Sequence, residues 1–321
     1  MSRITIRELA AACGVSIATV SKALNRSERI SEETIRRITA KAEELGYVGN
    51  RAARALSRGR RRIGFLLPAS SGELAERYRI GIRTVIPALE ARGIELCELF
   101  DAPSLDGVDA LLLPTSLLAG LTLPEDLPIA TVGSRASALH PVTEVTADYR
   151  IGGRLAAQFL AFATAGAPTA VLSARRTAYA EEEAIRGFRE LSSRLGTSVS
   201  AVVECGDGAR GVYTEMRRLL VANPRVKGIF VSAPMVGAVS AAAGELRRRL
   251  TVIGADFSRP AIEALRAGSV AALLYPSPER QTEAALLGLC EHLETGRAPG
   301  LVTVRQELVL KSNLESYMCN I

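Results

Sequence analysis

The sequence contains no tryptophan, and phenylalanine and tyrosine together make up only 4% of its 321 residues. Five cysteines are scattered without a CxxC pair or a metal-ligand spacing, so neither a metal site nor a disulfide framework is predicted. No run of eighteen apolar residues occurs, and we expect no membrane span. The first residues also lack the apolar core of a signal peptide. These absences predict a cytoplasmic protein with reduced thiols.

Catalytic motifs are missing as well. The only two histidines are His140, which precedes a proline in a predicted loop, and His292, late in a predicted helix. Gly206–Gly211 matches GxGxxG, but the acidic residue expected about 20 positions later is absent, so a nucleotide site is not predicted. Neither a nucleophile elbow nor a Walker loop is present. We therefore predict no enzyme activity, no cofactor and no metal.

The charge is distributed unevenly along the chain. The formal net charge is +6, and residues 1–62 carry +8 whereas the remaining residues carry −2. A basic head on a nearly neutral body is typical of a protein that binds a polyanion.

Residues 4–25 predict two short helices joined by a tight turn. Ile6 and Leu9 begin an apolar face at helical spacing, Gly14 permits a sharp turn, and Ser16 is placed to cap the second helix. The outward face of that helix carries small, polar or basic residues, namely Ser16, Ile17, Ala18, Thr19, Ser21, Lys22 and Asn25. Such a face fits a DNA major groove and its phosphates, so this segment is interpreted as a DNA-binding helix-turn-helix.

A third helix is predicted to start at the cap Ser31 and to end at Gly46, which completes a three-helix bundle over residues 1–46. Residues 47–62 form the next segment. Within it, residues 50–57 have helix-forming composition but are too short to form a stable isolated helix. Two interpretations stay open: a helix that forms only on DNA, and a solvated basic linker.

From residue 63 to residue 321, apolar runs alternate with amphipathic stretches. The predicted strands are Ile63–Leu67, Ile94–Phe100, Ala110–Leu113, Ile129–Val132, Ala170–Leu172, Val199–Val203, Gly228–Val231, Thr251–Ile253 and Ala271–Leu274. Alternation of this kind predicts parallel α/β sheets, and the length favours two linked lobes. Ligands of such folds bind at the carboxyl ends of the strands, here between the lobes.

The chain strongly resembles the LacI family of transcriptional repressors. The residues that carry the resemblance are Thr5–Ala10, Gly14–Asn25, Ile30–Ile35, Ala42–Tyr47 and Asn50–Ser57, and in the body, more loosely, Ile63–Pro68, Asp148, Gly152–Gly153, Gly187–Phe188 and Val252–Asp256. The resemblance implies an all-α helix-turn-helix bundle plus hinge, followed by a two-lobed periplasmic-binding-protein-like domain of parallel α/β sheets. It also implies a homodimer that binds a palindromic operator in double-stranded DNA, because each copy places one recognition helix on one half-site. The implied function is a repressor that a small-molecule effector controls.

The family pattern assigns roles residue by residue. It makes Ile17, Ala18 and Lys22 the base contacts, and Ala53 and Leu56 the hinge residues that enter the minor groove. Phosphate contacts are implied for Thr5, Ser16, Thr19, Ser21, Asn25 and Ser31.

The effector site departs from the pattern of sugar-binding members. Ala184 stands where they have an arginine, Ala233-Pro234 where they have Asn-Asp, and Pro276 where they have a glutamine. The remaining candidates for effector contact are Asp148, Asp256, Arg186 and Ser70. Three alternatives stay open: an effector other than an ordinary sugar, a pocket that uses other groups, and a site that has lost its ligand or responds to a protein partner. A solute-binding protein of a transporter would share the lobes, but the DNA-binding head argues against it.

Overall fold

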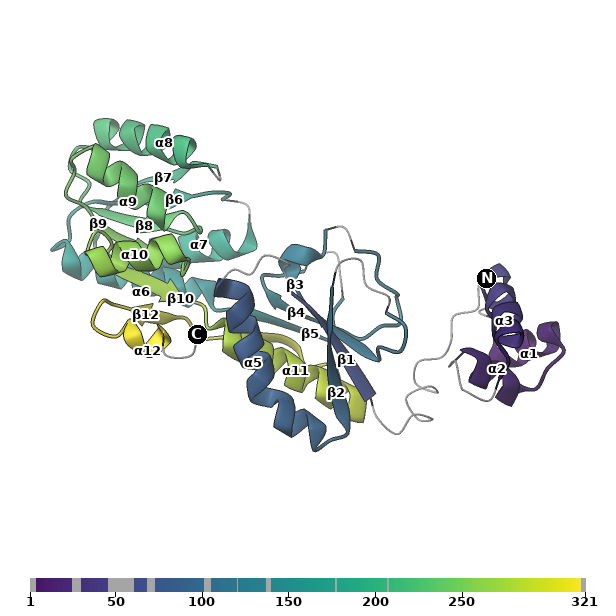
Figure 1. The fold of residues 1–321 in the computed structure, drawn as a ribbon. Coiled ribbons are helices and arrows are strands. Elements are labelled where there is room, and N and C mark those ends of the chain that lie inside the picture. Colours follow the sequence, from purple (N-terminus) through teal and green to yellow (C-terminus); the bar gives the residue numbers. More distant parts are fainter. Residues whose placement is uncertain are drawn as a thin grey trace. The chain divides into compact units, whose positions relative to one another are not determined.

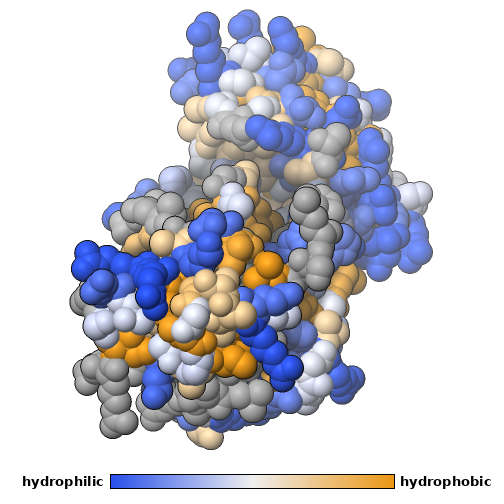
Figure 2. Space-filling view, turned by 90° about the vertical axis from the view of Figure 1, so that its right-hand side faces the viewer, coloured by the Kyte–Doolittle hydropathy of each residue, from blue (hydrophilic) through white to orange (hydrophobic). Residues whose placement is uncertain are grey.

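The structure, a computed structural model, describes residues 4–24, 30–45, 61–67, 73–100, 105–119, 121–136, 140–176, 178–206 and 208–318. The chain divides into two compact units, Met1–Arg61 and Arg62–Ile321 (Figure 1). Within the described ranges, no helix is both long and apolar enough to cross a bilayer. On the face drawn in Figure 2, hydrophobic residues gather in patches among hydrophilic ones, as on most folded proteins.

The first unit is a small helical bundle made of α1 (Ile6–Cys13), α2 (Ile17–Leu24) and α3 (Glu32–Glu44). α1 ends at Gly14, whose φ of 65° lets the chain turn sharply into α2 without a steric penalty. The apolar faces meet in one core, which consists of Leu9, Ala10, Val20, Ala23, Ile38 and Ala42. The predicted helix-turn-helix and third helix are therefore confirmed over the described part of residues 1–46.

The second unit contains two six-stranded sheets, and each sheet is the centre of one lobe. In lobe 1 the strand order is β11-β5-β4-β3-β1-β2, and the pairs from β11 to β1 are parallel. Helices α5 and α11 pack side by side on one face (Figure 1), whereas leucines of residues 105–127 cover the other. The elements of lobe 1 are β1 (Arg61–Leu66), α5 (Glu73–Glu90), β2 (Ile94–Leu99), β3 (Ala110–Pro114), η1 (Thr115–Leu117), β4 (Ile129–Gly133), β5 (Thr143–Ala147), α11 (Pro278–Thr295) and β11 (Gly300–Val304).

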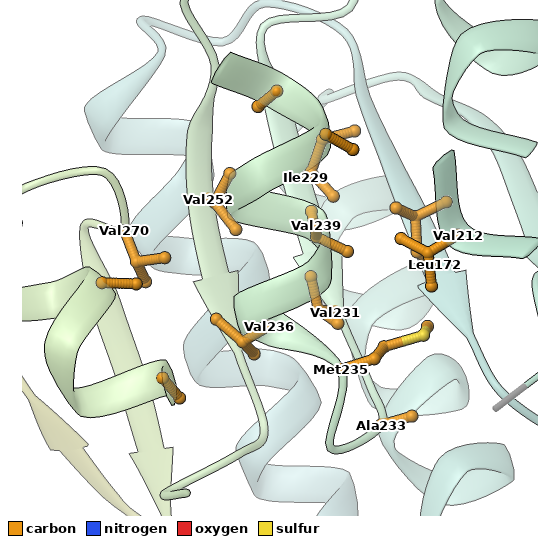
Figure 3. Packing of buried hydrophobic residues seen from close by; sticks show 14 of the residues in the cluster. Leu172, Val212, Ile229, Val231, Ala233, Met235, Val236, Val239, Val252 and Val270 are labelled. Atoms are coloured by element: carbon orange, nitrogen blue, oxygen red, sulfur yellow. The ribbon is translucent and has the colours of Figure 1, made fainter. Parts of the chain in front are cut away.

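Lobe 2 has the strand order β12-β10-β9-β8-β6-β7, in which only the β10–β12 pair is antiparallel among the described pairings. Successive side chains of its strands enter two separate cores: Ile229 and Val231 of β8 face α8, α9 and α10 (Figure 3), whereas Phe230 faces α6 and α7. Burial on both faces explains the continuous apolar runs. The elements are α6 (Tyr149–Ala163), β6 (Thr169–Ser173), α7 (Tyr179–Arg194), β7 (Val199–Glu204), α8 (Ala209–Ala222), β8 (Gly228–Val231), α9 (Val236–Glu245), β9 (Thr251–Gly254), α10 (Arg259–Ala267), β10 (Ala272–Tyr275), β12 (Glu307–Val309) and α12 (Glu315–Met318).

The chain passes between the lobes three times: from β5 to α6, from β10 to α11, and from β11 to β12. The two-lobed α/β architecture is therefore as predicted. Three strands, β5, β11 and β12, were not expected from the sequence. β5 is central but reads Thr-Glu-Val-Thr-Ala, with Thr143, Glu144 and Thr146 all buried, so it lacks the apolar run that marks the other central strands.

Candidate functional site

The exposed face of α2 carries the three predicted base-contact residues. Ile17 lies in the first turn with 44% of its surface exposed, Ala18 is exposed beside it, and Lys22 is exposed one turn farther along. Thr19 and Ser21 are half-buried on the same helix. Val20 and Ala23 anchor the opposite face in the core, so the orientation of α2 within the bundle is fixed by packing. The arrangement offers one branched apolar side chain and one flexible cation to a partner surface.

Three predicted phosphate-contact residues are the N-terminal caps of the three helices. The Ser16 hydroxyl accepts a hydrogen bond from the Thr19 amide at 3.0 Å, and Ser31 accepts one from the Thr34 amide at 3.4 Å. The Thr5 hydroxyl accepts one from the Glu8 amide at 3.3 Å. Each helix N-terminus presents free backbone amides and the positive end of a helix dipole, a combination that binds phosphate groups.

Thr5 differs from the other two caps because its backbone amide and its hydroxyl are both already hydrogen-bonded to a carboxylate. The Thr5 amide and hydroxyl donate to Glu8 Oε2 at 2.7 and 2.9 Å. These hydrogen bonds to Thr5 lower the pKa of the Glu8 carboxyl from its ordinary value of 4.5. A phosphate at this cap therefore has to compete with Glu8 for the Thr5 hydroxyl.

Four predicted site residues, Asn25, Ala53, Leu56 and Ser70, lie outside the described residues. The segment predicted as the hinge, residues 47–62, is described only at Arg61 and Arg62. Their assignments stay predictions.

Asp148 and Asp256 both follow strands, but they have different surroundings. Asp148 caps α6: its Oδ1 accepts a hydrogen bond from the Ile151 amide at 3.0 Å. Asp256 follows β9 and is only 6% exposed, and its two oxygens accept bonds from the amide and hydroxyl of Ser258 at 2.9 and 3.1 Å. Burial raises the pKa of Asp256 above its ordinary value, although these hydrogen bonds oppose the shift.

Arg186 lies two turns after the N-terminus of α7, the helix that follows β6. It is therefore distant from the end of α7 that lies nearest the end of β6. Its guanidinium pairs with Glu182 and Glu183 at 3.2 and 2.8 Å, and it borders a groove beside Val202 of β7. Ala184, which stands at the family's arginine position, is buried in the packing of α6 against α7. The structure therefore does not bring Arg186 together with Asp256 at the strand ends.

Tyrosines gather at the boundary between the lobes, which the sequence analysis did not predict. The Tyr149 hydroxyl, at the start of α6, donates to the Gly133 carbonyl at the end of β4 over 2.5 Å. The Tyr149 and Tyr179 rings meet edge to face at 6.3 Å, and the Arg135 guanidinium lies 5.6 Å from the Tyr179 centroid. Burial raises the pKa of Tyr149, and that of Tyr78 to about 12, so both hydroxyls stay protonated donors.

Gln281 is a second residue that the sequence analysis missed. It is 2% exposed and lies in α11 just after the second crossover. Its Oε1 accepts a hydrogen bond from the Gly133 amide at 3.0 Å, while its Nε2 donates to the Pro276 carbonyl at 2.7 Å. One amide side chain thus ties the end of β4 to the crossover. The signal in the sequence is weak: Gln281 and Thr282 are polar residues on the helix face that otherwise carries the apolar residues of α11.

Two protein families match different parts of the chain, one in each of its two units. Residues 5–50 match the family "Bacterial regulatory proteins, lacI family", and residues 125–297 match the "Periplasmic binding protein domain". The HTH-type transcriptional regulator CelR of Thermobifida fusca is 30% identical over 258 residues, which cover 73% of this chain and 75% of CelR. The maltose regulon regulatory protein MalI of Escherichia coli is 28% identical over 71% of each chain.

Solved structures share the fold. A transcriptional regulator CelR in complex with cellobiose aligns over 96% of this chain and 99% of its own, with a TM-score of 0.60 and 21% identity. The arabinose-binding protein AraP of Geobacillus stearothermophilus aligns over 80% of this chain and 99% of its own, with a TM-score of 0.68 and 17% identity. AraP thus corresponds to most of this chain and leaves about a fifth of it unmatched.

Proposed function

Because the chain belongs to the LacI family of bacterial regulatory proteins, we propose that this DNA-binding transcriptional regulator is a homodimeric repressor controlled by a small molecule bound between its lobes. The observation that carries the proposal is the exposed face of α2. It places Ile17, Ala18 and Lys22 on one side of a helix whose other side is locked in the core. A palindromic operator follows from dimerisation, since each copy supplies one reading helix.

Each exposed residue has a distinct role in this proposal. Lys22 donates to O6 and N7 of a guanine, whereas Ile17 and Ala18 contact thymine methyl groups. Phosphates bind at helix N-termini, at hydroxyls and at the Asn25 amide, namely at Thr5, Ser16, Thr19, Ser21, Asn25 and Ser31. Leu56, with Ala53 beside it, wedges into the minor groove at the operator centre and kinks the duplex.

The test is selection of bound duplexes from a random pool, followed by sequencing and by affinity measurements on the selected operator. We expect an enriched palindrome, with a log K that falls steeply with log salt. Lys22→Ala should then weaken operator binding by about 10–100-fold and relax the preference at one base pair of each half-site. Lys41→Ala is the matched control, because Lys41 lies on α3 and pairs with Glu44. Binding without any enriched sequence would refute the operator-reading role.

The proposed effector site is centred on Asp256, with Asp148 and Ser70 as further contacts. Arg186, which lies along α7 and pairs with Glu182 and Glu183, is left out of this site. Asp256 supports this role best because its carboxylate is buried and follows a strand. A ligand there would have to replace some of the hydrogen bonds that the carboxylate accepts from Ser258, Val236 and Phe257. The CelR–cellobiose complex shares this fold, which supports a small-molecule ligand as the class of effector. The absence of the family's Arg, Asn and Gln donors favours an effector other than an ordinary sugar.

Calorimetry of the purified protein against metabolite pools, followed by Asp256→Asn, tests this site. We expect the substitution to weaken effector binding at least tenfold while the operator affinity of the free protein stays unchanged. An unchanged effector affinity would remove Asp256 from the site. A failure of every pool to bind favours the alternative, a regulator whose effector site is lost or recognises a protein. The intramolecular partners of Arg186, Asp148 and Asp256 support that alternative, since a ligand would have to compete with them.

A further inference from the structure

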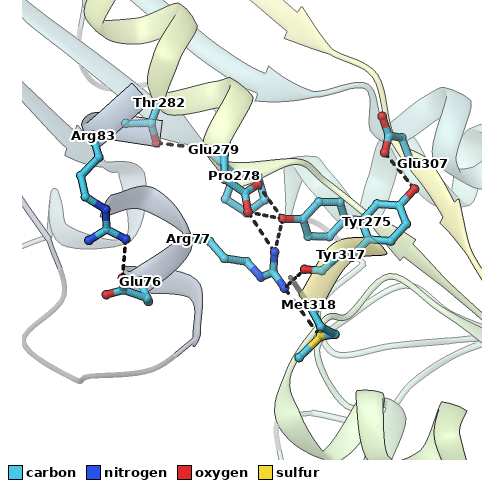
Figure 4. Close-up of polar contacts among 10 residues, drawn as sticks. All are labelled: Glu76, Arg77, Arg83, Tyr275, Pro278, Glu279, Thr282, Glu307, Tyr317 and Met318. Atoms are coloured by element: carbon cyan, nitrogen blue, oxygen red, sulfur yellow. Dashed lines mark hydrogen bonds and ion pairs between the residues drawn. The ribbon is translucent and has the colours of Figure 1, made fainter. Parts of the chain in front are cut away.

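Arg77 is a buried arginine at the contact between the lobes, and no other arginine of the described residues is buried. It lies on α5 and is 3% exposed. Its Nη1 donates to the Tyr275 hydroxyl at 2.6 Å and pairs with Glu279 at 2.9 Å (Figure 4). Its Nη2 donates to the Tyr317 carbonyl at 2.9 Å. The guanidinium therefore meets a carboxylate, a phenol and a carbonyl at once.

Aromatic rings enclose the same guanidinium. Its Cζ lies 4.8 Å from the centroid of Phe257 and 5.0 Å from that of Tyr275, distances at which a cation is attracted to the ring quadrupole. The rings also support one another: Phe257 and Tyr275 are 4.6 Å apart, and Tyr275 and Tyr317 are 5.1 Å apart. We call Phe257, Tyr275, Tyr317 and Glu279 the guanidinium cage.

The cage joins the two lobes. Its three rings pack against the core of lobe 2. Arg77 lies on α5, whose neighbouring Tyr78 and Ile82 pack in the core of lobe 1, and Glu279 lies in the first turn of α11 on the same lobe. Glu279 also accepts a hydrogen bond from the Tyr275 hydroxyl at 2.5 Å. An arginine of lobe 1 thus fills a recess that lobe 2 largely builds.

We propose that the guanidinium cage is a cation-binding site which the chain fills with its own Arg77, and that this occupancy is a latch that holds the lobes together without any effector. The latch holds in the free protein, before any operator or effector is bound, so it goes beyond the proposed function. One feature of the latch limits its strength: the buried Arg77 Nε has no hydrogen-bond partner among the described residues. An unpaired buried donor destabilises the latched state, and so lowers the free energy needed to separate the lobes.

Chemical complementation tests the cage. Arg77→Ala removes the atoms that N-ethylguanidine contains, so the full-length variant should regain stability when this compound is added. We expect Arg77→Ala to lower the melting temperature by about 5 °C or more, because it leaves Glu279 and the rings without their cation. N-ethylguanidine should reverse most of the loss with saturation at about 1 mM, as expected of six well-placed non-hydrogen atoms.

Two controls separate the cage from general effects. Arg83→Ala, on the same helix, removes an exposed arginine that pairs only with Glu76 in Figure 4, so N-ethylguanidine should leave this variant unchanged. Ethylamine, which lacks the planar fork, should rescue Arg77→Ala poorly. Equal responses of Arg77→Ala, Arg83→Ala and the wild type to N-ethylguanidine would overturn the proposal.

Arg77→Lys provides a second variant that keeps the charge if Arg77→Ala does not fold. Small-angle scattering should show a larger radius of gyration for Arg77→Lys than for Arg83→Lys, because a lysine cannot reach Tyr275, Glu279 and Tyr317 together. Identical scattering and identical melting temperatures of these two variants would show that Arg77 does not hold the lobes.

Discussion

Gly153→Ala should destabilise the second unit through the close packing of α6 on α7. A Cβ at Gly153 would lie 1.9 Å from the Ala184 carbonyl oxygen and 2.8 Å from the Phe188 nitrogen. The reciprocal position, Gly187, is equally tight, since its Cβ would lie 2.0 Å from the Arg150 carbonyl oxygen. Both obstacles are backbone atoms, so no side chain can move aside. The helices would have to separate by more than 1 Å to restore an ordinary contact.

The magnitude follows from two opposing effects. Alanine is favoured over glycine within a helix by about 1 kcal/mol. Overpacking a close contact costs about 1–3 kcal/mol and more where the backbone has to shift, and separation of α6 from α7 would also loosen the packing around Phe188. We therefore expect a net loss of about 2 kcal/mol, which lowers the melting temperature of a unit of this size by about 4–8 °C.

Gly244→Ala in α9 is the matched control with the opposite sign. Beyond the adjoining residues and backbone of α9 itself, no heavy atom of the described residues lies within 4 Å of a Cβ at Gly244, so the substitution should stabilise by about 0.5–1 kcal/mol. Differential scanning calorimetry of the full chain resolves the two variants. If Gly153→Ala raised the melting temperature as Gly244→Ala does, the close approach of α6 and α7 would be wrong.

Two further predictions concern DNA binding and acid stability. Leu56→Ala should weaken operator binding much more than binding to random DNA, because it removes an apolar wedge but no charge. Equal losses of affinity on the two DNAs would contradict the wedge. Arg54→Ala should instead reduce the slope of log K against log salt. The Arg150 and Arg154 guanidinium groups lower the pKa of Glu190 from 4.5 to about 2, so its stabilisation is present above pH 4.5 and is lost as the pH falls toward 2. Melting temperatures of the wild type and of Glu190→Gln should therefore converge over that range, and a constant difference would count against the pairing.

Elements with a periodic apolar pattern could be predicted from the sequence, and the others could not. The three helices of the first unit and the parallel strands of the lobes each carry a buried apolar face. β5 has no such pattern because tertiary contacts satisfy two of its buried polar side chains. Glu144 accepts from the Ala136 amide and pairs with Arg135, and the Thr143 hydroxyl donates to the Gly300 carbonyl. β11 alternates between half-buried and exposed residues at the end of the sheet in lobe 1, and β12 has only three residues.

The candidate site also has a part that the sequence predicts and a part that it does not. The exposed residues of α2 lie within the six positions from Ile17 to Lys22, so a helix and its apolar face were enough to place them. Arg77 and its cage are separated by about 180–240 positions, and no local spacing connects an arginine of α5 with Phe257 or Tyr317. Only the crossovers between the lobes bring them together.

The latch also determines what an effector has to do. Arg77 lies on α5, the first helix after β1, and α5 packs in the core of lobe 1. Release of Arg77 removes polar contacts between this helix and Tyr275 and Tyr317 of lobe 2, and so favours the open arrangement of the lobes. A ligand shifts this equilibrium only by its differential affinity for the latched and open lobes. An effector that binds Asp256 equally well in both arrangements would leave operator affinity unchanged, however tightly it binds. Tight binding of a small molecule is therefore not by itself evidence of regulation. The affinity of that molecule has to be compared between the wild type and Arg77→Ala.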